Sequence, residues 1–362
     1  MADPLDTPLT RALGCRLPVV QTAMGWVSTP ELVAASSNAG AFGFLAAAVM
    51  TRTEAEGAIA RVRDLTHHGF GVNFHAFQPD AAAIVDLILA NRDQVRAVSF
   101  GRGPDAAAIR RFRDAGIVCM PTVGALKHAQ KMAQLGCDLI TVQGGEGGGH
   151  TGAVASSVLL PQVLDAVKAP VVAAGGFADG RGLAAALAYG AAGIAMGTRF
   201  LMTRESPAPG AAKAKYVGAA VDDIVVTTRV DGIPQRMILN GALQRIEKAG
   251  PVAAWARAIE HGLALKRATG ASFAELLASA RSMTSHGGLS LRQAVMAACA
   301  PMLIKRAMID GDAERGLMAT GLVAGRLGDL PSCAELLAGI EADARARIAV
   351  LTGAAPQPCG AA

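Results

Sequence analysis

A ten-residue segment at positions 142–151, VQGGEGGGHT, combines five glycines with one histidine, His150. Glycine has no Cβ and adopts positive φ readily, so this backbone can bend sharply and approach a flat ligand closely. A histidine at the end of the segment would place a group that titrates near neutral pH against whatever the glycines hold. A flexible surface turn would have a similar composition. The rest of the chain must therefore distinguish a ligand cradle from a turn.

Two further glycine sequences follow apolar runs and contribute Gly175, Gly176, Gly197 and Thr198. At the ends of the last two strands of an α/β barrel, such glycines expose backbone N–H groups beside helix N-termini, where phosphate binds. Tight turns are the alternative interpretation. Asp179 and Gly180, which would open the next helix, favour the phosphate site. The sequence lacks a G-x-x-x-x-G-K-[ST] motif, so it does not indicate a nucleoside triphosphate.

The elements that must position these residues are strands alternating with helices. Helical patterns such as 29–40, 104–116 and 179–190 follow apolar runs, and several end on glycine, as helix C-termini often do. The runs do not alternate polar and apolar residues, which is typical of strands buried on both faces of a parallel sheet. There are eight such runs: 18–25, 41–47, 70–76, 97–101, 117–123, 139–145, 170–176 and 193–200.

Eight strand–helix units over about 200 residues predict a TIM (β/α)8 barrel, an α/β fold, across residues 8–222. A doubly wound open sheet would need fewer units and would bind its ligand in one crevice. Residues 223–240 predict short β structure with a turn at Asp231 and Gly232. A C-terminal, mainly helical lobe is expected over 223–350, covering the catalytic face, and a flexible tail over 351–362. Breaks in the helical pattern fall at 270–273, 285–288 and 328–332.

Composition excludes several classes of protein. The net charge is +5 and basic residues are scattered, so we expect no nucleic-acid partner. The N-terminus lacks a signal-peptide pattern, and the longest uncharged run contains four glycines, so we expect a cytoplasmic protein without a membrane span. No C-x-x-C pair is present, so neither a metal site nor a disulfide framework is indicated. The six cysteines are Cys15, Cys119, Cys137, Cys299, Cys333 and Cys359.

Several segments together resemble the nitronate monooxygenase superfamily, whose members are FMN-dependent TIM barrels and include a flavin-containing enoyl-ACP reductase. The segments are QTAMG (21–25), GVNF (71–74), QGGEGGGHTG (143–152) and the run from PVVAAGG to MGTRF (170–200). The resemblance covers residues 8–350 and implies an FMN cofactor. It assigns the FMN phosphate to Gly175, Gly176, Gly197 and Thr198. It also implies that His150 is the catalytic residue and that the flavin is lined by Ala23, Met24, Asn73, Gln143, Gly148 and Gly149.

Within the superfamily the chain is most similar to a subgroup from steroid degradation, which acts on the CoA thioester of a methyl-hydrindanone. The similarity rests on residues 21–27, 144–152, 227–232, 300–305 and 329–333. It implies an FMN-dependent oxidoreductase with a small-molecule substrate, in which His150 acts as an acid or base or donates a hydrogen bond. Oxidation of alkyl nitronates by O2, enoyl-thioester reduction, and flavin binding without turnover remain alternatives. The Ala-rich lobe is also compatible with a homodimer.

Other side chains carry weaker hypotheses. Glu146 would orient the glycine loop or His150, or would be an exposed loop acid. His75 would face the flavin or pack in the core, and Trp26 would wall a substrate site or pack beneath the lobe. His128 is expected on a solvated helix face, and His286 is a candidate substrate contact. Candidates for a CoA phosphate, each also explained as an exposed charge, are Arg229, Arg236 and Lys305.

Overall fold

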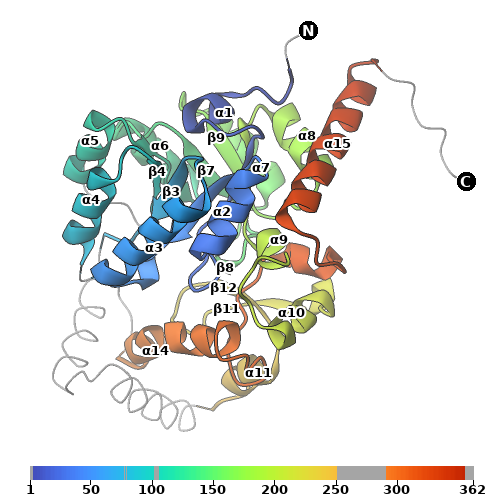
Figure 1. The fold of residues 1–362 in the computed structure, drawn as a ribbon. Coiled ribbons are helices and arrows are strands. Elements are labelled where there is room, and N and C mark those ends of the chain that lie inside the picture. The colour runs from blue at the N-terminus through green and yellow to red at the C-terminus, as the bar shows by residue number, and fades with distance from the viewer. Residues whose placement is uncertain (1–2, 77, 79, 102–105, 251–290, 355–362) are drawn as a thin grey trace, which may run out of the picture. The chain divides into compact units, whose positions relative to one another are not determined.

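The computed structural model describes residues 3–76, 78, 80–101, 106–250 and 291–354 (Figure 1). The chain divides into two compact units. The barrel unit comprises residues 1–147, 152–207 and 329–362. The second unit comprises residues 148–151 and 208–328. The second half of the glycine segment therefore belongs to a different unit from the first half.

The described part of the barrel unit contains a sheet of nine parallel strands. Their order in space is β5 (Val118–Cys119), β4 (Val95–Ser99), β3 (Phe70–Asn73), β2 (Phe42–Ala46), β1 (Val19–Gln21), β10 (Gly193–Met196), β9 (Val171–Ala174), β7 (Ile140–Gln143) and β6 (Thr122–Val123). Every residue of β2, β9 and β10 is buried. The apolar runs therefore form strands covered on both faces, as predicted.

The two ends of this sheet, β5 and β6, are one chain segment separated only by Met120 and Pro121. On one side, the Met120 N–H donates to the Val98 carbonyl at 2.9 Å. On the other side, the Thr141 N–H donates to the Pro121 carbonyl at 2.8 Å. The segment thus pairs with both neighbours and closes the sheet into a barrel of eight strand positions. This closure confirms the predicted TIM barrel.

Helices connect the strands, as a parallel sheet requires. Their N-termini carry local sequence signals: Thr51 and Glu54 form a capping box, and the Asp179 carboxylate accepts from the Gly182 N–H. Up to residue 207, the described helical elements of the barrel unit are α1 (Pro8–Leu13), α2 (Pro30–Asn38), η1 (Ala47–Val49), α3 (Arg52–Leu65), α4 (Ala81–Ala90), α5 (Ala106–Asp114), α6 (Leu126–Gln134), α7 (Ser156–Leu164), α8 (Gly180–Tyr189) and α9 (Thr198–Leu201).

The last described helix, α15 (Cys333–Leu351), also belongs to the barrel unit and lies along α8 in Figure 1. The two helices approach closely because Gly180 has no side chain: a Cβ there would lie 2.4 Å from the Ala344 backbone N. The expected lobe over 223–350 therefore differs from the observed division, in which residues 329–354 pack with the barrel. The four residues 351–354 continue α15 or cap it. The rest of the expected tail lies outside the described residues.

The second unit contains a three-stranded antiparallel sheet in the order β11 (Ile224–Thr227), β12 (Gln235–Ile238) and β8 (Gly149–His150). The expected turn is present, with Gly232 at φ 85°. Its core includes Val230, Met237, Leu243 and Leu317. The described helical elements are α10 (Gly210–Val217), η2 (Val221–Asp223), α11 (Gly241–Glu247), α14 (Leu291–Met308) and η3 (Leu322–Arg326). The predicted breaks at 270–273 and 285–288, with His286, lie outside the described residues.

None of the helices that the structure describes is long and apolar enough to cross a lipid bilayer.

Candidate active site

Most of the predicted site residues lie at one rim of the barrel. Because all its strands are parallel, their C-terminal ends meet at the same rim, where enzymes of this fold carry their sites. The strands β1, β10, β9 and β7 are consecutive neighbours in the sheet, and β3 lies two positions beyond β1. The rim residues contributed by these five strands are Ala23, Met24, Asn73, Gln143, Gly175, Gly176, Gly197 and Thr198.

The loop after β1 is held by a buried polar pair, Gln21 and Ser28. The Gln21 amide donates to the Ser28 hydroxyl oxygen at 2.8 Å, and the Met24 N–H donates to the same oxygen at 2.9 Å. The Ser28 hydroxyl in turn donates to the Thr22 carbonyl at 2.9 Å. Within this turn Trp26 takes a φ of 62°, the left-handed region that non-glycine residues rarely occupy. The loop is therefore fixed in shape, with a strained tryptophan at the rim.

The glycines after β9 and β10 leave the rim without side chains. Gly175 and Gly176 have φ values of 99° and 80°. A Cβ on Gly197 would lie 3.1 Å from Thr22 Oγ1 and 3.4 Å from Met24 Sδ. Successive backbone N–H groups in a turn without side chains can face an anion. This part of the rim therefore fits a phosphate.

Glu146 fixes the first half of the glycine loop. Both carboxylate oxygens lie 3.0 Å from the Ser156 N–H, and one of them accepts from the Ser156 hydroxyl at 2.8 Å. Ser156 is the first residue of α7, so the carboxylate caps that helix and meets its positive end. The Ser156 hydroxyl also lies 3.1 Å from the Gly175 carbonyl oxygen. Glu146 thus orients the loop, one of its two expected roles, beside the glycine pair after β9.

His150 lies in the second unit, on β8, opposite Gln235 of β12. Its Nε2 lies 2.7 Å from Asp231 Oδ2, and its side chain is 54% exposed while that of Asp231 is 8% exposed. Asp231 Oδ2 also accepts from the Gln235 amide at 2.5 Å, and Oδ1 accepts from the Ile233 N–H at 3.0 Å. Burial raises the pKa of Asp231, but these hydrogen bonds and the attraction to His150 outweigh it and bring the pKa below its usual range.

Sequence reasoning missed Asp231 and Gln235 as partners of His150. The Asp231–Gly232 dipeptide indicated only a turn, and a turn is indeed present. The one further signal was that Asp231 lies within the TTRVDG segment shared with the steroid subgroup. Local spacing alone does not show that this carboxylate meets a histidine 81 positions earlier.

Gly148 and Gly149 also belong to the second unit. A Cβ on Gly148 would lie 2.5 Å from the Gly321 backbone N, so glycine is needed there for a close approach of two backbones. Gly149 has a φ of 64°. That both glycines lie beside a flavin stays a prediction. Within the second unit, Gly148 permits a close backbone approach and Gly149 adopts a left-handed conformation.

The weaker candidates fall in different places. His75 is half-buried just after β3, with its backbone N–H donating to Gln78 Oε1 at 2.9 Å. His128 is exposed on α6, as expected. The Arg229 guanidinium pairs with Glu247 at 3.5 Å, and Lys305 is exposed on α14. Arg236 is half-buried on β12.

Four of the cysteines, Cys15, Cys119, Cys137 and Cys333, are not activated nucleophiles. Burial raises the pKa values of Cys15, Cys137 and Cys333 to about 12. Burial also raises the pKa of Cys119. Thiols in this state hold their protons at neutral pH and do not supply a thiolate.

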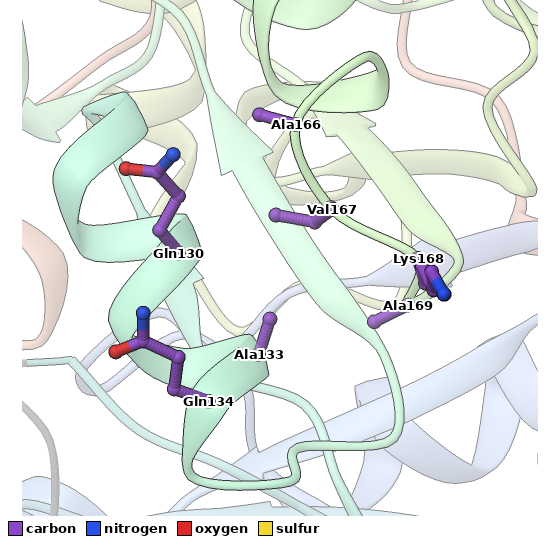
Figure 2. A pocket seen from close by; sticks show the side chains of 7 residues that line it. All are labelled: Gln130, Ala133, Gln134, Ala166, Val167, Lys168 and Ala169. Atoms are coloured by element: carbon purple, nitrogen blue, oxygen red, sulfur yellow. The ribbon is translucent and has the colours of Figure 1, made fainter.

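An open depression lies at the other end of the barrel (Figure 2). Gln130, Ala133 and Gln134 come from the second half of α6, and residues 166–169 precede β9. The start of a strand and the end of the preceding helix mark the N-terminal rim, where conservation and structure in this fold serve stability. The depression is therefore separate from the candidate active site.

The structure is an α/β barrel whose glycine-lined rim has room for a phosphate-bearing ligand. The chain matches the nitronate monooxygenase family over residues 6–88 and 83–343, so it belongs to that family and is an oxidoreductase. Membership in this family, together with the rim, indicates a flavin cofactor.

Two curated relatives carry the same name, (3aS,4S,5R,7aS)-5-hydroxy-7a-methyl-1-oxo-octahydro-1H-indene-4-carboxyl-CoA dehydrogenase. The protein from Rhodococcus jostii is 47% identical over 347 residues, covering 96% of this chain and 98% of the relative. The protein from Mycobacterium tuberculosis is 48% identical over 343 residues, covering 94% and 96%. Among solved structures, FabK from Thermotoga maritima has a TM-score of 0.77 and 29% identity, covering 96% of this chain and 99% of that one.

Proposed function

We propose that this protein is an FMN-dependent dehydrogenase whose substrate is the CoA thioester of a methyl-hydrindanone carboxylic acid, a steroid-ring fragment. The observation that carries the proposal is the extent of the identity with the two curated dehydrogenases. At 47% and 48% over at least 94% of the chain, it must include most of the second unit as well as the barrel. Features common to the barrel alone would not distinguish one substrate from another.

FMN is supported by the number of phosphate positions that the rim offers. Gly175 and Gly176 with Gly197 and Thr198 form one glycine-lined site at the ends of β9 and β10, which suits a single phosphate. Asn73 is held in place by hydrogen bonds from its Nδ2 to the Ser99 carbonyl and hydroxyl oxygens, at 3.0 Å each. A bound flavin would supply the two-electron redox chemistry, and the protein would supply orientation and proton transfer.

A dehydrogenation releases one hydrogen with its electron pair and a second hydrogen as a proton. His150 is the residue that we assign to the proton. Chain connectivity supports this assignment, because His150 is two residues from Gly152, which belongs to the barrel unit.

Several of the weaker candidates are suited to contact the substrate. Trp26 would provide a rigid apolar wall for the ring system from its fixed loop. Arg236 and Lys305 would contact the anionic CoA moiety from the second unit, where both lie. Arg229 is a weaker candidate because it already pairs with Glu247.

The test is anaerobic reduction of the bound flavin. We expect the CoA thioester of a 5-hydroxy-7a-methyl-1-oxo-octahydroindene carboxylic acid to bleach the flavin absorbance within the time of a turnover. His150→Ala should retain its flavin and lose this reaction, whereas His128→Ala, on an exposed face of α6, should behave like the wild type. Rapid oxygen uptake with propionate 3-nitronate, without bleaching by the thioester, would instead show the nitronate monooxygenation that names the family. A protein that binds no flavin after reconstitution would contradict both.

A further inference from the structure

His150 is one member of a hydrogen-bonded group of side chains in the second unit. Three side chains of the second unit form one chain of hydrogen bonds: Gln235 to Asp231 at 2.5 Å, and Asp231 to His150 at 2.7 Å. Asp231 and Gln235 are buried, with 6% and 3% of their surface exposed, while His150 is largely exposed. The imidazole is therefore partly accessible to solvent, whereas the carboxylate and the amide behind it are buried.

The protonation states in this chain follow from its donors. An ionised carboxylate can only accept hydrogen bonds. Asp231 receives one from the Ile233 N–H and one from the Gln235 amide, both obligatory donors, and these bonds favour its charged form. The bond to His150 must then be donated by Nε2–H. In the neutral ring, Nδ1 is consequently the nitrogen that carries no proton.

We propose that Asp231 is a positioning residue that holds His150 as the Nε2–H tautomer and makes Nδ1 the base of the reaction, with Gln235 fixing the carboxylate. The catalytic role of Nδ1 rests on the proposed function, whereas the tautomer of His150 does not depend on it. Asp231 acts through His150 and need not touch the substrate.

A bound flavin would accept the two electrons of the oxidation, together with the hydrogen that leaves the substrate carbon as hydride. The second hydrogen leaves as a proton to His150 Nδ1, and its bonding electrons remain on the substrate as the new double bond. His150 becomes an imidazolium cation, and the adjacent Asp231 carboxylate, already ionised, stabilises that charge.

Gln235 suits this arrangement because it is neutral. Its amide donates to the oxygen that also faces His150, so it restricts the carboxylate without adding a competing charge. A glutamate at this position would bring a second carboxylate against the first, and the two could not both be ionised at low energy. The β8–β12 register places Gln235 opposite His150, and Asp231 lies in the turn just before β12.

The substitution Asp231→Asn separates a positioning role from a structural one. It preserves size and retains an amide oxygen to accept from the Ile233 N–H, so the turn that begins at Asp231 is kept. It replaces the charged oxygen that faces His150 and Gln235 with an amide NH2, which donates hydrogen bonds and does not accept them. Only the control of the imidazole should be lost.

The experiment combines two measurements on the flavin-loaded protein. In ¹⁵N-histidine NMR, with His150 assigned by comparison with His150→Ala, we expect the Nε2–H tautomer in the wild type and its loss in Asp231→Asn. In anaerobic rapid kinetics with the CoA thioester, we expect Asp231→Asn to slow flavin reduction about 100-fold or more. Flavin content and the substrate concentration for half-maximal rate should stay close to wild type. The double variant with His150→Ala should be no slower than His150→Ala alone.

An Nδ1–H tautomer in the wild type would overturn the inference. So would wild-type rates in Asp231→Asn, or a double variant in which both losses multiply, because that result would assign Asp231 an effect independent of His150. If no CoA thioester reduces the wild-type flavin, the proposed function fails, and the tautomer measurement still decides the inference.

Discussion

The glycine pair after β9 provides a sharp test of how the rim is built. Gly175 and Gly176 both have positive φ, 99° and 80°, so alanine is strained at either position. The two differ in the space around them. A Cβ on Gly175 would lie 3.1 Å from the Gly144 backbone N and O and from Ser156 Oγ, whereas one on Gly176 would be 3.5 Å from the Glu146 Cβ.

These distances set how much each alanine substitution should lower the free energy of unfolding. A left-handed non-glycine residue costs about 1–2 kcal/mol, and the lower chain entropy of unfolded alanine offsets about 0.5–1 kcal/mol of this. Gly176→Ala should therefore lower the free energy of unfolding by roughly 1 kcal/mol. Gly175→Ala adds overpacking against a fixed backbone, worth about 1–3 kcal/mol. Its total loss should be roughly 2–4 kcal/mol, about 2 kcal/mol more than that of its neighbour.

The assay is urea unfolding of the flavin-free protein, followed by titration with FMN. Gly57→Ala is the matched control, because Gly57 lies on the exposed face of α3 with open space around it, and the substitution should be neutral or stabilise by about 0.5–1 kcal/mol. If the pair binds the phosphate, Gly175→Ala should also weaken FMN affinity roughly 10-fold, which is about 1.4 kcal/mol. Equal losses at Gly175 and Gly176, or unchanged FMN affinity in both variants, would refute the reasoning.

Three further measurements test other parts of the structure. Asp329→Ala removes the partner of Arg199. Asp329 is 68% exposed, but the Arg199 guanidinium, 2.7 Å away, is 3% exposed, so losing this bond should lower the free energy of unfolding by about 1–3 kcal/mol. The exposed pair of Arg52 with Glu56 is the comparison, and Glu56→Ala should cost under about 1 kcal/mol. Trp26→Gly should be more stable than Trp26→Ala by about 1 kcal/mol, because both remove the indole but only glycine relieves the left-handed strain. The pKa of Asp231 is lowered on folding, so its stabilising contribution is present above its unfolded pKa and is lost as pH falls through the folded value. The stability difference between wild type and Asp231→Asn should therefore narrow below about pH 4, and a constant difference would contradict the direction of that shift.

The barrel was predictable because its signals are local. Each buried parallel strand is an apolar run, and glycines or capping residues such as Asp179 mark where helices end and begin. The strand ends could then be assigned to one rim by topology alone. That assignment placed Asn73 and Gly175 together without any knowledge of distances.

The position of α15 was not predictable in the same way. Its amphipathic pattern shows a helix but not the surface on which the helix docks. The decisive residue, Gly180, lies more than 150 positions earlier and reads in the sequence as part of a helix N-terminus. Its missing Cβ lets the Ala344 backbone approach, and that complementarity exists only in three dimensions. The same limit applies to the ion pair of the buried Arg199 with the exposed Asp329.

The glycine segment shows how one sequence feature can serve two units at once. The chain leaves the barrel unit after Gly147 and rejoins it at Gly152, and the four residues between contribute β8 to the sheet of the second unit. Gly148 is needed there because the Gly321 backbone lies too close for a side chain. The glycines at this end therefore set the register that brings His150 opposite Gln235 and within reach of Asp231. If that register defines the base, Gly148→Ala should disturb the histidine tautomer while leaving the Gly175 turn intact, which separates the catalytic half of the segment from its cofactor-binding half.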